Sequence, residues 1–237
     1  MNLVLLHPEE INNGKSVLTG RRLQHLLSVT KVKPGDQLKV GELNGLMGTA
    51  VVDSISETFV SLNIELSDQP PSPLPLTLIL AMPRPKMLRR TLQTIAAMGV
   101  KNIYLINAYR VEKSFWQTPL LQEQAIQREL ILGLEQARDT KLPQVQIRKR
   151  FKPFIEDELP SLIKHSTALV AHPVTGQACP VDIKEPVSLA IGPEGGFIPY
   201  EVDKLVESGF QAVHIGRRIL RVENAVPALI SRLYPGM

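Results

Sequence analysis

The sequence predicts an α/β protein with two domains, a small β-rich domain at residues 1–70 and a larger one with a mainly parallel sheet at residues 71–237. Three observations lead to this prediction. The length of 237 residues suits one large or two modest domains. Residues 68–75 include four prolines, which favour a stiff, extended connector over a helix or a strand. At this linker the hydrophobic pattern changes from short strands separated by turns to strands that alternate with helices.

Before the linker, short apolar runs alternate with turn signals such as the Asn44-Gly45 pair. Strands are expected at residues 38–40, 49–52 and 59–64. This spacing indicates a small antiparallel barrel or sandwich. One helix is expected to begin after Thr19, because the leucines at positions 23, 26 and 27 recur at helical spacing.

Beyond the linker, apolar strands alternate with amphipathic helices, the pattern of a parallel sheet. The strands are expected at residues 76–81, 102–106, 145–147, 168–171, 187–191 and 212–215. The helices are expected at residues 86–98, 118–138, 155–165, 199–208 and 223–233. Sheets of this kind bind small molecules at the carboxyl ends of their strands, so functional residues are expected in the loops that follow the strands.

The net charge of +4 is unevenly distributed along the chain. Residues 1–70 contain 6 basic and 8 acidic side chains, whereas residues 84–152 contain 14 basic and 5 acidic ones. A local surplus of positive charge indicates a polyanionic partner such as a nucleic acid. The alternative is a solvated face with scattered counter-charges.

Composition also restricts the class of protein. No apolar run approaches the roughly 18 to 20 residues that a membrane-spanning helix needs, and the first residues lack the basic and apolar pattern of an export signal. Cys179 is the only cysteine, which excludes an intrachain disulfide and a multi-cysteine metal cluster. We therefore expect a cytoplasmic protein without membrane association and without a bound metal.

A glycine-rich segment, residues 192–197 (the glycine loop), follows the predicted strand at 187–191. Its glycines allow a ligand to approach the backbone closely at the end of a buried strand. The loop lacks the Gly-Lys-Ser/Thr of a phosphate-binding P-loop, and its glycine spacing differs from the dinucleotide fingerprint. It indicates either a small-molecule site of another kind or simply a tight turn between a strand and a helix.

A second segment, residues 216–221 (the arginine loop), follows the predicted strand at 212–215. It places Arg217, Arg218 and Arg221 within five residues, an arrangement that an anion or an RNA phosphate would stabilise. The interleaved Ile219 and Leu220 imply that the loop packs against something. The alternative is a solvated run of surface charge.

Taken together, residues 191–197 (IGPEGGF) and 215–225 (IGRRILRVENA) resemble two motifs of the RsmE family of ribosomal RNA methyltransferases. Residues 24–31 and the following Pro34-Gly35-Asp36 are similar to the signature of that family's N-terminal PUA-like barrel. The family methylates N3 of a uridine in 16S rRNA and belongs to the SPOUT, or α/β-knot, superfamily. The resemblance therefore implies a C-terminal SPOUT domain with a deep trefoil knot and a mainly parallel sheet, preceded by an RNA-binding PUA-like β-barrel.

The resemblance also implies a cofactor, S-adenosyl-L-methionine, bound largely by backbone groups of three loops. The residues that it assigns to this cofactor are Ala171, His172, Ile191, Gly192, Glu194, Gly195, Gly196, Ile215, Gly216, Ile219, Leu220 and Ala225. It further implies a homodimer in which the partner chain completes the active site.

Methylation of uridine N3 requires the imide proton to leave and the resulting negative charge to be stabilised. On this ground we expect Arg221 and Glu223 to be catalytic, with Glu223 positioning the ring or accepting the proton. The expected partner is 16S rRNA or the small ribosomal subunit. The residues expected to contact RNA are Arg21, Arg22, Lys31, Arg84, Lys86, Arg89, Arg110, Arg217 and Arg218.

The chain departs from the family pattern at several positions. Arg84-Pro85-Lys86 stands where the family usually has Lys-Gly-Asp-Lys, and Asn224 replaces a common threonine. Two alternatives therefore remain: a SPOUT methyltransferase acting on another rRNA or tRNA nucleotide, and a non-catalytic RNA-binding factor in ribosome assembly. Trp116 has alternatives as well, since it would either stack on a base or belong to the core or a dimer contact.

Overall fold

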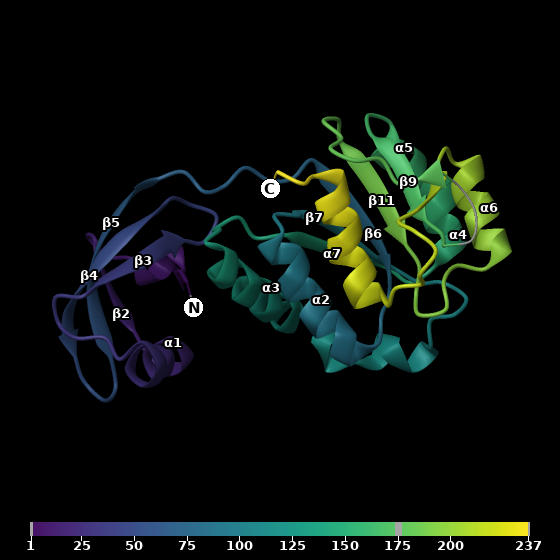
Figure 1. The fold of residues 1–237 in the computed structure, drawn as a ribbon. Helices are drawn as coiled ribbons and strands as arrows, with labels where there is room; N and C mark the ends of the chain where they lie inside the picture. Colours follow the sequence, from purple (N-terminus) through teal and green to yellow (C-terminus); the bar gives the residue numbers. More distant parts are fainter. Residues whose placement is uncertain (1, 174–176, 237) are drawn as a thin grey trace. The chain divides into compact units, whose positions relative to one another are not determined.

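The computed structural model describes residues 2–173 and 177–236. They form two compact units (Figure 1). The first contains residues up to Ser72 together with Ile131–Leu142, and the second contains Pro73–Leu130 together with the chain from Pro143 onwards. The proline-rich linker lies between the last strand of the first unit, which ends at Asp68, and the first strand of the second, which begins at Leu76.

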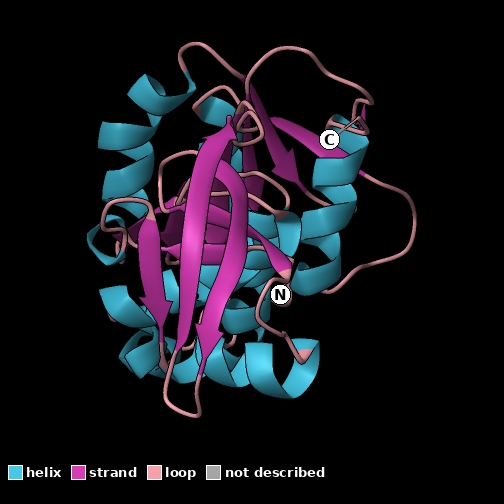
Figure 2. Ribbon diagram, turned by 90° about the vertical axis from the view of Figure 1, so that its left-hand side faces the viewer, coloured by secondary structure: helices cyan, strands magenta, loops and turns pink. Residues whose placement is uncertain are grey.

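The first unit is built on a curled five-stranded sheet with the order β1-β3-β4-β5-β2. The strands are β1 (Val4–Leu6), β2 (Lys15–Leu18), β3 (Gln37–Glu42), β4 (Met47–Ile55) and β5 (Val60–Asp68). Their neighbours are antiparallel except for β1 and β3, which run parallel. The strands nearest the viewer in Figure 2 belong to this half-barrel and are visibly curved.

One side of this sheet is closed by the helix α1 (Gly20–His25) and the π-helical turn Leu26–Thr30 that continues it. Leu23 and Leu26 are buried there against residues of the sheet such as Val40 and Leu62. The predicted helix after Thr19 is confirmed, because Thr19 is the residue that precedes its first turn. The predicted antiparallel arrangement is confirmed for β2, β3, β4 and β5. The short β1, which was not predicted, joins the edge of the sheet in the parallel direction.

Residues 131–142 pack within the first unit although they follow its strands by more than sixty positions. The carbonyl oxygen of Glu135 accepts hydrogen bonds from the backbone amides of Asn2 (3.1 Å) and Leu3 (3.0 Å). The Thr140 hydroxyl donates to the carbonyl oxygen of Gly45 (2.6 Å). This association was not predicted, because each contact joins positions that are distant in the chain.

The second unit is built on a seven-stranded sheet with the order β10-β12-β9-β11-β6-β7-β8, in which every pair of neighbours is parallel. The strands are β6 (Leu76–Ala81), β7 (Asn102–Ile106), β8 (Gln144–Arg148), β9 (Thr167–Ala171), β10 (Gln177–Ala178), β11 (Val187–Ile191) and β12 (Gln211–His214). The central strand β11 is buried at every position, as expected when helices cover both faces. The predicted mixed α/β fold with a parallel sheet is confirmed.

Helices cover both faces of this sheet: α2 and α7 lie on one face, and α5 and α6 lie on the other (Figure 1). The helices of the second unit are α2 (Pro85–Ala97), α3 (Glu123–Ala137, whose last residues belong to the first unit), α4 (Phe151–Pro153), the π-helical turn Phe154–Glu158, α5 (Leu159–Ile163), α6 (Pro199–Glu207) and α7 (Val222–Leu233). Short 3₁₀ turns span Pro8–Glu10, Lys113–Gln117 and Pro119–Leu121.

Several predicted boundaries were wrong, and three of them show why. The helix expected at 118–138 begins only at Glu123, because Pro119 opens a separate 3₁₀ turn after Thr118. The helix expected at 155–165 starts earlier, at Phe151, and ends at Ile163 as a series of α and π turns. The strand expected at 212–215 ends at His214, so the next residue already belongs to the loop.

Candidate functional site

The site lies where three neighbouring strands end. β12, β9 and β11 are adjacent and parallel, so the loops that follow them leave the same edge of the sheet. The backbone amide of His172, just after β9, donates to the carbonyl oxygen of Val213 in β12 (2.9 Å). The glycine loop after β11 and the arginine loop after β12 therefore meet beside the end of β9.

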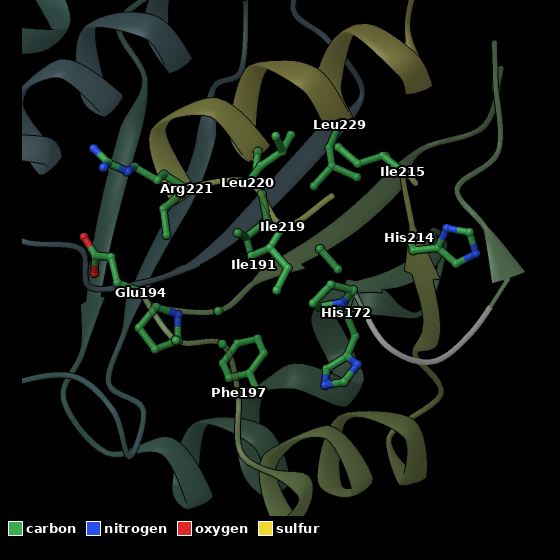
Figure 3. A pocket seen from close by; sticks show the side chains of 18 of the residues that line it. His172, Ile191, Glu194, Phe197, His214, Ile215, Ile219, Leu220, Arg221 and Leu229 are labelled. Carbon is green, nitrogen blue, oxygen red and sulfur yellow. The ribbon is translucent and has the colours of Figure 1, made fainter. Parts of the chain in front are cut away.

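These loops enclose a pocket of about 570 Å³ (the donor pocket), shown in Figure 3. This volume falls within the range of typical small-molecule and cofactor sites. All twelve residues assigned to the cofactor line it: Ala171, His172, Ile191, Gly192, Glu194, Gly195, Gly196, Ile215, Gly216, Ile219, Leu220 and Ala225. The structure thus brings together positions that are up to 54 residues apart in the sequence.

The glycine loop has a shape that only glycine permits. A Cβ on Gly192 would lie 2.8 Å from the backbone nitrogen of Phe197 and 3.1 Å from the carbonyl carbon of Gly196. Gly195 and Gly196 both have positive φ angles, +99° and +76°. The amide of Gly196 donates to the carbonyl oxygen of Pro193 (2.7 Å), which closes the turn. The tight turn therefore leaves no room for a side chain at Gly192.

Two further segments hold the glycine loop in place. Arg110, in the loop after β7, donates from Nη1 to the carbonyl oxygen of Gly195. The backbone amide of Arg84, at the start of α2, donates to Glu194 Oε1 (3.4 Å). Both arginines were expected to contact RNA, and the structure shows that each also contacts the glycine loop.

The buried Glu201 carboxylate fixes the start of α6. Its Oε2 accepts from the backbone amide of Ile198 (3.0 Å), and its Oε1 accepts from the amide of Tyr109 (2.7 Å). Pro199, the first residue of α6, needs no hydrogen-bond acceptor for its nitrogen. This carboxylate therefore connects the end of the glycine loop to the loop after β7.

Two of the three arginines of the arginine loop lie at the donor pocket, and the third lies outside it. Arg218 and Arg221 line the donor pocket, whereas Arg217 does not. Arg221 precedes the first turn of α7, and its carbonyl oxygen accepts from the amide of Ala225 (2.8 Å). Glu223 lies in that first turn but is not part of the pocket wall.

Apolar side chains make much of the pocket wall. Ile191, Ile215, Ile219 and Leu220 come from the strand ends and loops, and Leu229 comes from the middle of α7. Figure 3 shows Arg221 and Glu194 on one side of the pocket and His214 on the opposite side. The apolar side chains match a ligand with an apolar or aromatic body. The backbone of the glycine loop offers hydrogen-bonding groups for the few polar groups of such a ligand.

Cys179 lies outside the donor pocket but next to His214, which lines it. The amide of Cys179 donates to the carbonyl oxygen of His214 (2.8 Å). Burial raises the pKa of the Cys179 thiol, an effect that the neighbouring Arg232 opposes. The thiol is therefore a poor nucleophile near neutral pH.

Several residues expected to contact RNA lie elsewhere and already have partners. Arg21 pairs with Glu135 (2.9 Å), Arg22 pairs with Glu10, and Arg89 pairs with Glu129 (3.3 Å). The hydrogen bond from Arg22 lowers the pKa of Glu10.

Lys31 and Lys86 are exposed. Of the nine residues expected to contact RNA, Arg110 and Arg218 line the donor pocket.

Other residues of the pocket wall were not expected from the sequence. Phe197 belongs to the glycine loop, so its position next to the assigned glycines is the signal that would have found it. Val213 and Leu229 carry no such signal, because an apolar residue in a strand or helix has the same pattern in a core as in a pocket. Within residues 2–173 and 177–236, no group of three metal-ligating side chains is present.

Comparison with known proteins agrees with this arrangement. A family model described as an RNA methyltransferase domain matches residues 70–234, most of the chain. The chain is also 31% identical over 235 residues to the ribosomal RNA small subunit methyltransferase E of Treponema pallidum, covering 96% of this chain and 88% of that protein. The chain belongs to the RNA methyltransferase domain family.

Two solved structures resemble this chain over nearly its whole length. The ribosomal RNA small subunit methyltransferase E of Neisseria gonorrhoeae, bound to S-adenosyl methionine, is 26% identical, with a TM-score of 0.75 over 98% of this chain and 95% of that one. A protein of Legionella pneumophila, in complex with the same cofactor, superposes with a TM-score of 0.78 at 22% identity, over 97% and 95% of the two chains. The second likeness supports the fold alone. No helix in the described part of the chain is long and apolar enough to cross a membrane.

Proposed function

We propose that this protein is an S-adenosylmethionine-dependent ribosomal RNA methyltransferase that acts in the cytoplasm on N3 of a uridine in the 16S rRNA of the small subunit. The observation that carries the proposal is the donor pocket, in which the glycine loop and the arginine loop meet at the carboxyl ends of β11 and β12. Membership of an RNA methyltransferase family and the cofactor bound by the Neisseria gonorrhoeae relative support the same function.

The donor pocket suits S-adenosylmethionine on physical grounds. Ile191, Leu220 and Leu229 offer apolar contacts for the adenine ring and for the aliphatic part of the methionine chain. A Cβ added at Gly196 or Gly216 would meet no atom within 4 Å, so the space beside these backbones is free for a ligand. When bound, the cofactor would supply an electrophilic methyl group on its sulfonium.

The chain's own contribution to the reaction is positioning and charge stabilisation. Arg221 lies at the pocket wall, where its guanidinium would stabilise negative charge on O2 or O4 of the uracil as the N3 proton leaves. Glu223, two residues further along the chain in the first turn of α7, would orient the ring or accept that proton. Arg218 would hold a phosphate at the mouth of the same pocket.

The finer fold assignment belongs to the same proposal. Residues 71–237 would form a SPOUT domain in which the chain around the donor pocket is threaded into a trefoil knot, and residues 1–70 would form a PUA-like domain that binds RNA. The curled sheet of the first unit and the parallel sheet of the second are compatible with these domains. The exposed Lys31, Lys86 and Arg217 are candidates for RNA phosphates.

A homodimer would complete the active site. Ile219 is 80% exposed and Leu220 is 40% exposed, although both are large apolar side chains in the arginine loop. Exposed apolar residues beside a pocket are typical of a surface that another chain covers. A second copy of this chain is the partner that fits the proposal.

Calorimetry with S-adenosylmethionine tests the proposed function and separates it from that of a non-catalytic assembly factor. The full chain should bind the cofactor with a dissociation constant in the micromolar range, and the Gly192→Ala variant should bind it more weakly. Absence of binding to the folded wild-type protein would reject the enzyme and favour the assembly factor.

A further inference from the structure

A second cavity of about 640 Å³ (the side pocket) lies in the second unit next to the donor pocket. It is formed by the loop after β7, the 3₁₀ turn Lys113–Gln117, the segment that follows β8, and the start of α6. Neither the cofactor assignment nor the catalytic residues use any part of it. Its wall combines aromatic and basic side chains, the combination that binds single-stranded nucleic acid.

The two pockets are lined by neighbouring residues. Arg110 lines the donor pocket, while Tyr109 on its amino side lines the side pocket. In the same way Phe197 lines the donor pocket and Phe151 lines the side pocket, and their rings contact each other at a centroid distance of 6.3 Å. The side pocket is therefore next to the donor pocket, close to where an RNA substrate would place the residues that flank its methylated nucleotide.

The aromatic residues of the side pocket are available for stacking. Trp116 is held in place by a hydrogen bond from its Nε1 to Asn107 Oδ1 (2.9 Å). Tyr109 is 79% exposed and Tyr200 is 48% exposed. Exposed aromatic rings beside a fixed indole form a surface on which a base of any sequence can stack.

The charges of the side pocket favour an anion. Lys113 and Lys149 have no ion pair within the described residues, and Lys152 has a loose one with Glu156 (3.8 Å). Glu201 is the acidic residue that lines the side pocket. Its two carboxylate oxygens accept hydrogen bonds from backbone amides, so its negative charge is already stabilised. Lys113 and Lys149 are therefore free to contact a phosphate.

We propose that the side pocket binds a single-stranded nucleotide of the RNA substrate that flanks the methylated one, with its base against Trp116 or Tyr200 and its phosphate at Lys149. The proposal rests on the proposed function, because it assumes that the substrate beside the donor pocket is RNA. It adds a binding site that would fix the register of the substrate and thus contribute to the choice of nucleotide.

The fluorescence of Trp116 tests the site directly, because it is the only tryptophan of the chain. Titration of the full-length protein with a ten-nucleotide oligouridylate should quench this fluorescence in a saturable manner, and added salt should weaken the effect. No change in the emission at saturating oligouridylate would overturn the proposal. A change that depends on protein concentration and not on oligouridylate would also overturn it, since the occupant would then be a second copy of the chain.

Matched variants separate this proposal from the proposed function. Tyr200→Ala and Lys149→Glu should each weaken oligouridylate binding about tenfold, as expected for one stacked base or one phosphate contact. Val206→Ala on the same helix and Lys164→Glu after α5 are exposed controls that should leave binding unchanged. All four variants should bind S-adenosylmethionine as the wild type does.

The outcomes of the two proposals are distinguishable. If the wild type methylates small subunits and Tyr200→Ala and Lys149→Glu have an unchanged KM for that RNA, the side pocket is not part of the RNA site. If oligouridylate quenches Trp116 in the wild type but neither RNA nor subunits are methylated, the side pocket stands and the proposed enzyme is rejected.

Discussion

Arg110 donates a hydrogen bond from its guanidinium to the backbone oxygen of Gly195, which joins the loop after β7 to the glycine loop. This bond should hold the loop in the shape that binds the cofactor. A hydrogen bond from a charged donor at an exposed position stabilises by about 1 kcal/mol, so Arg110→Ala should weaken S-adenosylmethionine binding about fivefold. Arg90→Ala, an exposed arginine of α2, is the control. Calorimetric affinities that are equal for both variants would show that the loop holds its shape without Arg110.

Gly192→Ala should damage the donor pocket severely. The added methyl group would lie 2.8 Å from the backbone nitrogen of Phe197, and backbone atoms cannot move aside as a flexible side chain can. We expect at least a tenfold loss of cofactor affinity and a lower melting temperature. Gly236→Ala, where a Cβ would meet no atom within 4 Å, should change neither quantity. A Gly192→Ala protein that binds the cofactor normally would refute the proposed shape of the site.

Arg221→Ala should affect the reaction more than cofactor binding. Removal of one preorganised donor from a developing anion typically lowers kcat by about 100-fold to 1,000-fold. Arg217→Ala is the matched control, since it removes the same charge from the same loop outside the pocket. It should lower RNA affinity in a salt-dependent manner and leave kcat nearly unchanged. Equal values of kcat for the two variants would remove Arg221 from the catalytic assignment.

Glu135 should make the stability of the first unit depend on pH. Its side chain is only 3% exposed, and burial raises the pKa of this carboxyl above its ordinary value of 4.5, an effect that Arg21 opposes. The folded protein therefore holds the proton more tightly than the unfolded chain does, and stability should fall as pH rises above about 4.5.

Glu135→Gln removes this titration while retaining an acceptor for Arg21. The free energy of unfolding of the wild type relative to this variant should decrease between pH 4 and pH 7, as measured by urea denaturation. Glu57→Gln, an exposed acid in the turn after β4, should show no such trend. A difference between wild type and Glu135→Gln that rises with pH would mean that Arg21 outweighs the cost of burial.

The fold of the second unit was largely predictable because its strands are apolar runs of five or six residues bounded by turn residues. The strands at Leu76–Ala81, Asn102–Ile106 and Val187–Ile191 match their predicted ranges fully. Short edge strands were missed, as at Gln177–Ala178, because two residues carry no measurable periodicity. Helix boundaries failed where a proline starts a separate turn, as at Pro119.

The candidate site was predictable to the extent that its residues follow the ends of strands. Gly192 and Gly196 could be assigned to a ligand because glycines after a buried strand free the backbone for contact. Leu229 could not, because it reaches the pocket from the middle of α7 through tertiary packing alone. Arg110 was expected to contact RNA, but its bond to Gly195 depends on two loops that are 85 residues apart.

The most direct test of the central claim is mass spectrometry of nucleosides from 16S rRNA. Small subunits from a strain that lacks this protein would be incubated with the purified protein and S-adenosylmethionine, in parallel with the Arg221→Ala variant. Our account predicts that 3-methyluridine is absent before incubation, that the wild type restores it, and that the variant restores far less. A methyl group on a different nucleoside, or none with a protein that binds the cofactor, would contradict the account.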